Sequence, residues 1–169
     1  LVDARQEARR ALIPGVFRGR DGADVTDEAF VQVLDGATGR SWYHRYDASE
    51  FDARADCFDV TVGPNRFTAE GISIDLPGLS GRVNFTTEFD PWPNTWRRPG
   101  IMGPYSWVPL MECYHGIVSF GHGLDGALDA AGEISDFTGG RGYIEKDWGR
   151  AFPAGYVWMH SNHLAGAPE

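Results

Sequence analysis

The stretch from Arg82 to Phe89 alternates between two kinds of side chain. Apolar or β-branched residues stand at every second position, namely Val83, Phe85, Thr87 and Phe89, and polar residues stand between them. Successive side chains of a β-strand point to opposite faces, so a period of two buries one face and leaves the other in water. The stretch therefore predicts a strand with one buried face.

Similar short stretches recur along the chain, separated by turns rich in glycine, proline, asparagine and aspartate. Asp35-Gly36, Gly63-Pro64-Asn65 and Pro77-Gly78 are typical of hairpin turns. Strands are predicted at 11–17, 29–34, 41–46, 58–62, 66–69, 71–76, 82–89, 108–120, 143–148 and 156–164, with a further hairpin within 124–137. The only helix candidate is short, at 49–56. The fold class predicted is all-β, an antiparallel meander.

The charge of the chain limits its partners. Its 169 residues carry a formal net charge of -9, whereas nucleic-acid binders usually present a basic face. The negative charge also gives no support for electrostatic binding to anionic lipids. An apolar or neutral ligand remains, and 13% aromatic residues are consistent with a core or cavity lined by rings.

Two further features concern the environment of the protein. Cys57 and Cys113 are too few for a disulfide scaffold and are expected to be reduced, half-buried thiols. No apolar run reaches the length of a membrane span. The chain begins at Leu1 rather than Met, which indicates a fragment, so the lack of a signal peptide does not decide location. A cytoplasmic or membrane-peripheral protein is the expectation.

Residues 90–107 interrupt the series of strands. They contain four prolines and the three tryptophans Trp92, Trp96 and Trp107. A long loop of this composition predicts a rigid lid or plug. The alternative, which we favour slightly, is that the tryptophans close one end of a barrel.

The segment from Gly140 to Gly149 is dense in charged, aromatic and glycine residues, and contains the only lysine of the chain, Lys146. In a strand, Tyr143, Glu145 and Asp147 share one face. Two neighbouring carboxyl groups repel when both are ionised, so burial keeps a proton on one of them. A neutral carboxyl group in an apolar site is a good general acid. The alternative is a solvated, charged strand.

The strands predicted at 108–120 and 156–164 add polar and aromatic groups to the same interior, provided that their polar faces point inward. A barrel interior would then hold Glu112, Tyr114, Tyr143, Glu145, Asp147, Trp158, His160 and Asn162. Polar groups in such an interior must find hydrogen-bond partners. His115 has the opposite strand phase to Glu112 and is predicted to be a core or rim histidine.

The other histidines do not predict a metal or cofactor site. His44 and His122 lie beside turns and are expected at the surface. His160 and His163 are three residues apart and face opposite sides of a strand, so they cannot easily share one ion. The glycines at 139–142 lack the strand–loop–helix context of a phosphate-binding loop. No metal and no cofactor are expected.

Four motifs resemble the tocopherol cyclase family. They are Met111–Gly116, Phe137–Gly149, Phe152-Pro153 and Trp158–His163, and the resemblance is strongest over residues 103–163. It implies a lipocalin-like β-barrel or half-barrel, incomplete here because the chain is shorter than the family's chains. A single domain over residues 1–169, with the 90–107 loop inside it, is expected.

Plant members of that family close a prenylated hydroquinone to a chromanol, an isomerase reaction on an isoprenoid. The reaction protonates an alkene and traps the tertiary cation with the phenol oxygen. We expect Asp147 or Glu145 to be the acid, with Asp147 preferred because its neighbours indicate a crowded strand end. Arg141 and Lys146 are expected to be ion-pair partners.

Aromatic side chains are expected to stabilise the cation and line the cavity, and His160 or Asn162 is expected to orient the hydroxyl group. The predicted substrate-binding residues are Glu112, Tyr114, Tyr143, Trp148, Trp158, His160 and Asn162. The expected partner is an apolar prenylated substrate, obtained through peripheral contact with a membrane. Alternatives are a non-catalytic lipocalin-like binder of an apolar ligand, and a hydratase or pericyclase on the same scaffold.

Overall fold

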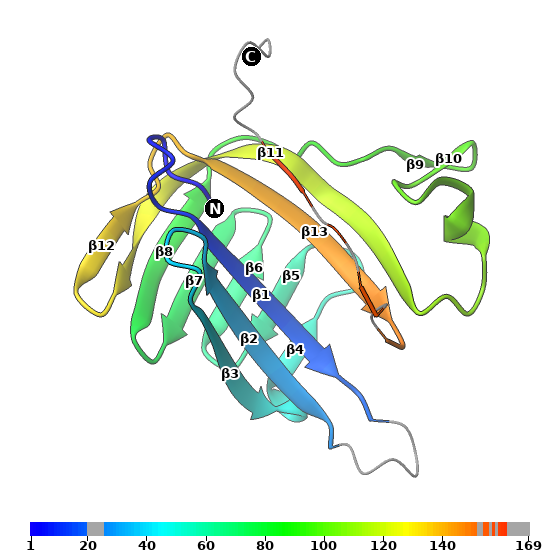
Figure 1. Cartoon of the computed structure of the whole chain (residues 1–169), viewed down its shortest axis with the longest axis horizontal. Helices are drawn as coiled ribbons and strands as arrows, with labels where there is room; N and C mark the ends of the chain where they lie inside the picture. The colour runs from blue at the N-terminus through cyan, green and yellow to red at the C-terminus, as the bar shows by residue number, and fades with distance from the viewer. Residues whose placement is uncertain (20–25, 152–153, 156, 158, 162–169) are drawn as a thin grey trace. The chain divides into compact units, whose positions relative to one another are not determined.

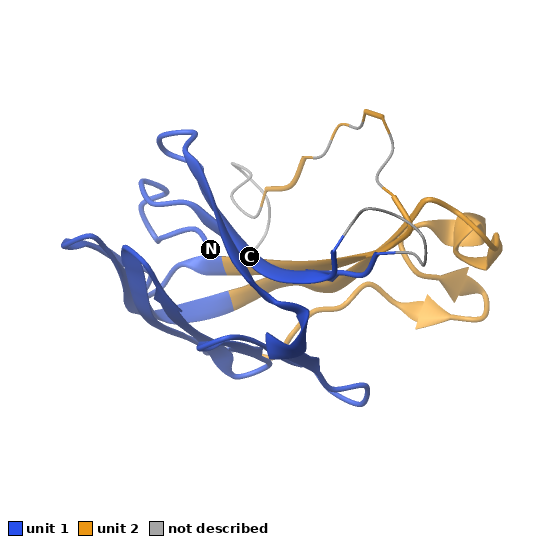
Figure 2. Cartoon of the chain, turned by 90° about the horizontal axis from the view of Figure 1, so that it is seen from below, with its two compact units in different colours: residues 1–87, 123–141 blue, residues 88–122, 142–169 orange. Residues whose placement is uncertain are grey.

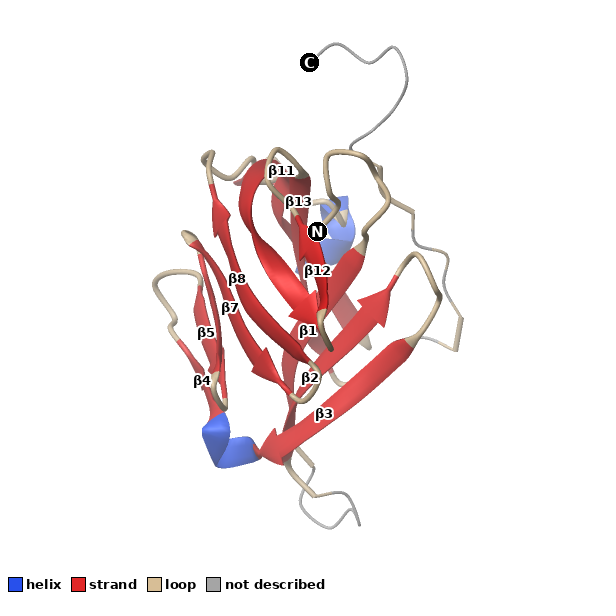
Figure 3. Cartoon of the chain, turned by 90° about the vertical axis from the view of Figure 1, so that its left-hand side faces the viewer, coloured by secondary structure: helices blue, strands red, loops and turns tan. Residues whose placement is uncertain are grey.

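The computed structural model describes residues 1–19, 26–151, 154–155, 157 and 159–161 (Figure 1). These residues form antiparallel strands and two short 3₁₀ segments, drawn in red and blue in Figure 3, and contain no α-helix. Across them no sheet closes into a barrel, so the all-β meander is confirmed in its incomplete, open form. None of the described helical segments is long and apolar enough to cross a bilayer.

The first sheet has the order β1-β2-β3. Its strands are β1 (Arg10–Phe17), β2 (Glu28–Asp35) and β3 (Ser41–Asp47). In β2, every second side chain is buried, and Ala29, Val31 and Val33 are at most 2% exposed. The Asp35 carboxylate accepts hydrogen bonds from the backbone N–H groups of Ala37 and Thr38, which fixes the predicted turn.

The second sheet has the order β12-β11-β8-β7-β6-β5-β4, and β13 pairs with β11. Its strands are β4 (Phe51–Ala53), β5 (Asp59–Val62), β6 (Asn65–Thr68), β7 (Gly71–Leu76), β8 (Leu79–Phe85), β11 (Cys113–Ala130), β12 (Glu133–Asp136) and β13 (Arg141–Gly149). The remaining elements are β9 (Asn94–Thr95), β10 (Arg98–Pro99), and the 3₁₀ segments η1 (Ala48–Glu50) and η2 (Gly103–Trp107). The hairpins β5–β6, β7–β8 and β11–β12 are confirmed.

Three predicted elements are wrong in type or extent. The helix candidate at 49–56 is the single turn η1, capped by Asp47 and Glu50, followed at once by β4. The strand predicted to reach Phe89 ends at Phe85. The strand predicted from Val108 begins only at Cys113 and continues to Ala130, because β13, β8 and β12 supply partners along its length.

The strand predicted at 156–164 is not present at Val157 or at residues 159–161, and the rest of that range lies outside the described residues. Other local expectations also differ. Cys113 is half-buried as predicted, and burial raises the pKa of its thiol, but Cys57 is exposed. His44 is partly buried within β3 rather than at a free surface.

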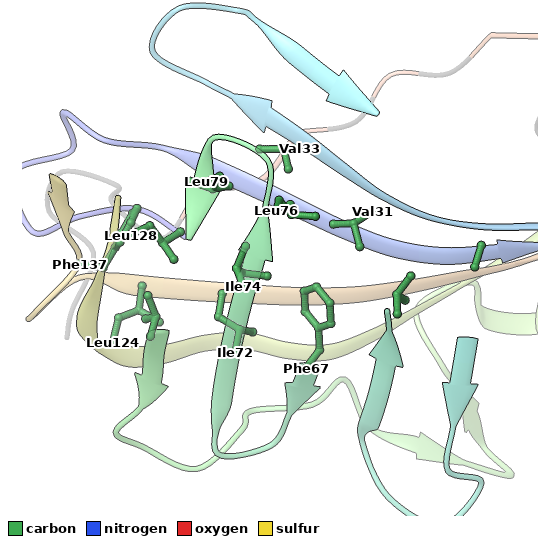
Figure 4. Close-up of a cluster of buried hydrophobic side chains, with 13 residues drawn as sticks. Val31, Val33, Phe67, Ile72, Ile74, Leu76, Leu79, Leu124, Leu128 and Phe137 are labelled. Carbon is green, nitrogen blue, oxygen red and sulfur yellow. The ribbon is translucent and has the colours of Figure 1, made fainter. Parts of the chain in front are cut away.

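The chain divides into two compact units (Figure 2). Unit 1 contains residues 1–87 and 123–141, and unit 2 contains residues 88–122 and 142–169. A single domain over the whole chain stays a prediction. Unit 1 holds a core of apolar side chains from β2, β5, β6, β7, β8 and β11, together with Phe137, which is fully buried (Figure 4). This burial is the main source of stability for unit 1.

Candidate functional site

Strand β13 pairs antiparallel with β11, and in unit 2 the backbone at the end of β13 lies directly against the chain at the start of β11. Gly149 lies against Glu112 and Cys113, and a side chain at Gly149 would meet the Glu112 carbonyl. That carbonyl accepts hydrogen bonds from the N–H groups of Arg150 (2.8 Å) and Ala151 (3.1 Å). The glycine thus allows the two backbones to meet, and this contact sets which residues of β11 face those of β13.

His115 of β11 lies between the two carboxylates of β13. Its Nδ1 is 2.7 Å from Oδ1 of Asp147, and its Nε2 is 3.8 Å from Oε2 of Glu145. The Tyr143 hydroxyl donates a hydrogen bond of 2.7 Å to the same Glu145 oxygen. The three side chains His115, Glu145 and Asp147 are 26%, 29% and 33% exposed. Together with Tyr143 they form a connected, partly solvated group of side chains that can carry protons. We call these four residues the His115 cluster.

Tyr143, Glu145 and Asp147 therefore lie on one face of β13, as strand alternation predicted. The prediction for β11 is wrong. Tyr114 stacks on Trp148, with ring centroids 5.7 Å apart and planes at 14°, so it lies with the opposite face of β13. His115, predicted to be a core or rim residue, is the β11 side chain that meets the carboxylates. The register between β11 and β13 places His115 beside Asp147. This register cannot be read from the sequence of either strand alone.

Glu112 also lies elsewhere than predicted. It is exposed, at a bend before β11 begins, and its contribution to the described structure is its backbone carbonyl. Lys146 is exposed and lies with its ammonium group 5.4 Å from the centre of the Trp148 ring. Arg141 is exposed and pairs through its backbone with Val2.

His160 lies against the same face as Tyr143 although it is not in a strand. Its ring stacks on Tyr143 with centroids 3.9 Å apart, and lies 6.4 Å from the ring of Phe120. Phe120 in turn contacts Trp92 at 5.4 Å. These contacts form a row of rings beside the His115 cluster. Two other predicted substrate-binding residues, Trp158 and Asn162, lie outside the described residues, as do the Phe152-Pro153 motif and His163.

A pocket of about 280 Å³ lies between β11 and the proline- and tryptophan-rich loop. Its lining includes Trp92, Met102, Trp107, Tyr114, His115 and Trp148. The loop follows β11 closely: the N–H of Trp92 donates to the carbonyl of Ile117 (3.3 Å), and that of Phe120 donates to the carbonyl of Asp90 (2.8 Å). His115 is the member of the cluster that reaches this pocket.

The loop does not bury its tryptophans. Trp96 is 78% exposed and Trp107 is 59% exposed. The favoured interpretation, in which they close the end of a barrel, is therefore wrong for these two residues. The loop is better described as a cover along the edge of β11, with one side towards the pocket and the other towards solvent.

His122, expected at the surface, is fully buried in unit 2. Its Nδ1 lies 3.0 Å from the Ser119 hydroxyl, and its ring packs against Phe89, with centroids 5.1 Å apart. Residues three apart in a regular strand point to opposite faces, so the contact between Ser119 and His122 shows that alternation is broken between them. Burial lowers the pKa of His122 from 6.5 to about 4, which keeps the ring neutral at pH 7.

This burial predicts a pH dependence of stability. The pKa of His122 is lowered in the folded state, so the unfolded chain binds the proton more tightly. The contribution of His122 to the free energy of unfolding should be constant above about pH 7 and fall as the pH drops from 6.5 towards 4, by about 3 kcal/mol. Urea unfolding across this range measures it. A His122→Asn variant should lose this contribution, and parallel profiles for the two proteins would contradict the prediction.

Among the described residues, no group of three or more histidine, cysteine, aspartate or glutamate side chains is arranged to hold a metal ion. The sequence model of one protein family, described as tocopherol cyclase-like, matches residues 40–169. Searches of curated proteins and of solved structures gave no significant match.

Proposed function

The chain belongs to the tocopherol cyclase-like family, and we propose that it closes a prenylated hydroquinone to a chromanol by proton transfer to an alkene and capture of the cation by the phenol oxygen. The observation that carries this proposal is the His115 cluster: an imidazole that contacts two carboxylates and also lines an aromatic pocket. Proton transfer is the chemistry that such a group performs best.

The reaction sets a specific requirement on the site. A proton adds to one alkene carbon, the cation forms at the other, the phenol oxygen bonds to it, and the phenol proton leaves. The product is an isomer of the substrate, so no proton is consumed overall. The protein needs an acid and a base, and a route that returns the proton from the base to the acid.

Two carboxyl groups joined through an imidazole meet this requirement. Asp147 acts as the acid in the proposal, and its Oδ1 lies 2.7 Å from Nδ1 of His115. Glu145 accepts the phenol proton, directly or through the Tyr143 hydroxyl. His115, with one nitrogen towards each carboxylate, returns the proton to Asp147.

The pocket supplies the other needs of the substrate. Its aromatic lining suits an apolar isoprenoid chain. Trp92 and Trp107 also line the pocket, and an indole face carries the negative quadrupole that attracts a cation. The row of Tyr143 and His160 lies on the carboxylate face, where the hydroxylated ring would be held.

One observation favours a second candidate, a non-catalytic binder of an apolar ligand. Glu145 and Asp147 are about a third exposed, as in a solvated charged strand, and an aromatic pocket alone is enough to hold such a ligand. A hydratase or pericyclase would use the same acid but end in a different product.

The test is turnover of a prenylated hydroquinone in D₂O by the full chain. Substrate and chromanol have equal mass in H₂O, so the informative product is a chromanol carrying one deuterium on carbon. We expect Asp147→Asn to lower kcat by about 10²–10⁴-fold, and Glu145→Gln to lower it by at least about 10-fold. The control is Lys146→Gln, which should retain activity. Lys146 lies between Glu145 and Asp147 in the strand and is exposed.

Three outcomes would count against the proposal. Binding of the hydroquinone without any product would establish the binder. A product that had gained water would establish a hydratase. Full turnover in both carboxylate variants would remove the His115 cluster from the chemistry.

A further inference from the structure

Residues 91–111, here called the apolar loop, expose large hydrophobic side chains to solvent. Their exposed fractions are 78% for Trp96, 65% for Tyr105, 59% for Trp107, 45% for Val108 and 75% for Leu110. Large apolar side chains that are exposed together on one loop often mark a binding surface. We propose that the apolar loop is a lipid-docking surface, which inserts its aromatic and aliphatic side chains into the interface of a phospholipid bilayer.

The backbone of the loop is held in a way that displays these side chains. Strands β9 and β10 form a small hairpin, in which Arg98 pairs with Thr95, so Trp96 and Arg97 form its tip. The segment η2 follows and contacts β10, and Figure 2 shows this region at one end of unit 2. Because the N–H groups of Gly100, Tyr105 and Val108 donate to carbonyls within the loop, these backbone groups can enter the interface without losing hydrogen bonds.

The end of the loop is tied to β11 and to the segment after β13. The Tyr114 hydroxyl donates a hydrogen bond of 2.7 Å to the carbonyl of Val108, and the Arg150 guanidinium donates one of 2.5 Å to the carbonyl of Leu110. Leu110 has a φ of 67°, a left-handed conformation that an L-residue adopts only when its surroundings impose it. The exposed Leu110 side chain is thus held outward by two hydrogen-bonded neighbours.

The charge of the loop fits a lipid interface. The whole chain has 24 acidic and 15 basic residues, yet residues 91–111 contain no acidic residue and two arginines, Arg97 and Arg98. The Arg97 guanidinium lies 5.8 Å from the centre of the Trp96 ring. Tryptophan and tyrosine concentrate at the headgroup level of bilayers, and a guanidinium binds lipid phosphate. The loop of this acidic chain thus offers guanidinium groups to lipid phosphates and no carboxylate that would repel them.

The same loop covers the pocket of unit 2. Trp107 is exposed on the loop and also lines the pocket, together with Trp92 and Met102. Trp107 would therefore contact both the bilayer and an apolar molecule in the pocket. The lipid contact does not depend on the cyclase reaction, so either can fail without the other.

The experiment is flotation of the full chain with phosphatidylcholine vesicles, without substrate. We expect the wild-type chain to float with the vesicles at both low and high salt. A double variant, Trp96→Ser with Leu110→Ser, should lower the partition constant between water and vesicles by about 100-fold, because two large apolar side chains no longer enter the bilayer.

The matched control is Trp42→Ser with Ile134→Ser in unit 1. Trp42 also has an arginine near its ring, Arg40 at 5.0 Å, and Ile134 is 71% exposed. This variant should float like the wild type. Circular dichroism and thermal unfolding of both variants verify that they fold.

Several results would overturn the proposal. One is failure of the wild type to bind neutral vesicles. Another is an equal loss of binding in the control variant. A third is self-association or capture of a protein partner that the Trp96 and Leu110 substitutions abolish while vesicle binding persists.

Discussion

Replacement of His115 with alanine should lower kcat of the proposed cyclisation by about 10²–10⁴-fold. The reason is geometric: the imidazole is 2.7 Å from Asp147 and 3.8 Å from Glu145, and it is the cluster member that lines the pocket. Without it, the proton taken from the phenol loses its direct relay through the imidazole to the acid. Steady-state turnover of the full chain with a prenylated hydroquinone measures the effect.

Rescue separates a chemical role of His115 from a structural one. The alanine substitution leaves a space at the pocket wall, so added imidazole should restore part of the lost kcat. A His44→Ala variant, in β3 of unit 1, is the control and should neither lose activity nor respond to imidazole. The assignment fails if His115→Ala turns over like the wild type, or if a folded His115→Ala chain is inactive at every imidazole concentration.

Gly142→Ala should strongly destabilise the pairing of β13 with β11. A Cβ at this position would fall within the ring of His122, which is fully buried and bonded to Ser119 at 3.0 Å. Overpacking of this kind costs about 1–3 kcal/mol, and displacement of the ring from Ser119 adds about 1 kcal/mol. Urea unfolding should show a loss of about 2–4 kcal/mol in the free energy of unfolding.

Gly155→Ala is the control, because a Cβ at Gly155 meets nothing within 4 Å. A double-mutant cycle sharpens the test: in a His122→Ala background, Gly142→Ala should cost much less, since the ring that it strikes is gone. Equal stability of Gly142→Ala and Gly155→Ala would show that the strands separate freely at this point.

The glycines of the β13 motif thus have a packing role. Gly142 admits the ring of His122, and Gly149 admits the backbone at Glu112. In the sequence these glycines only flank the charged residues of the motif, and neither packing contact can be predicted from it. His122 lies on β11 and Glu112 directly precedes it, and both are more than 19 residues away from their glycines in the chain.

Strand identity was predictable because its signals are local. Alternation and hairpin turns located β1, β2, β3, β5, β6, β7 and the β11–β12 hairpin within a few residues. Strand ends were not predictable, because a strand continues only while a neighbour offers hydrogen bonds. β8 stops at Phe85 although its alternation runs on to Phe89, whereas β11 runs unbroken to Ala130.

The candidate site, too, was predictable where it depends on one strand and not where it depends on the pairing of two. That Tyr143, Glu145 and Asp147 share a face follows from the period of one strand, and the structure agrees. Which residue of β11 meets them depends on register, and a shift of one residue turns every side chain to the opposite face. Local sequence therefore identified the carboxylates, while the close backbone contact between Gly149 and Cys113, made across a long intervening chain, brought His115 to them instead of Tyr114.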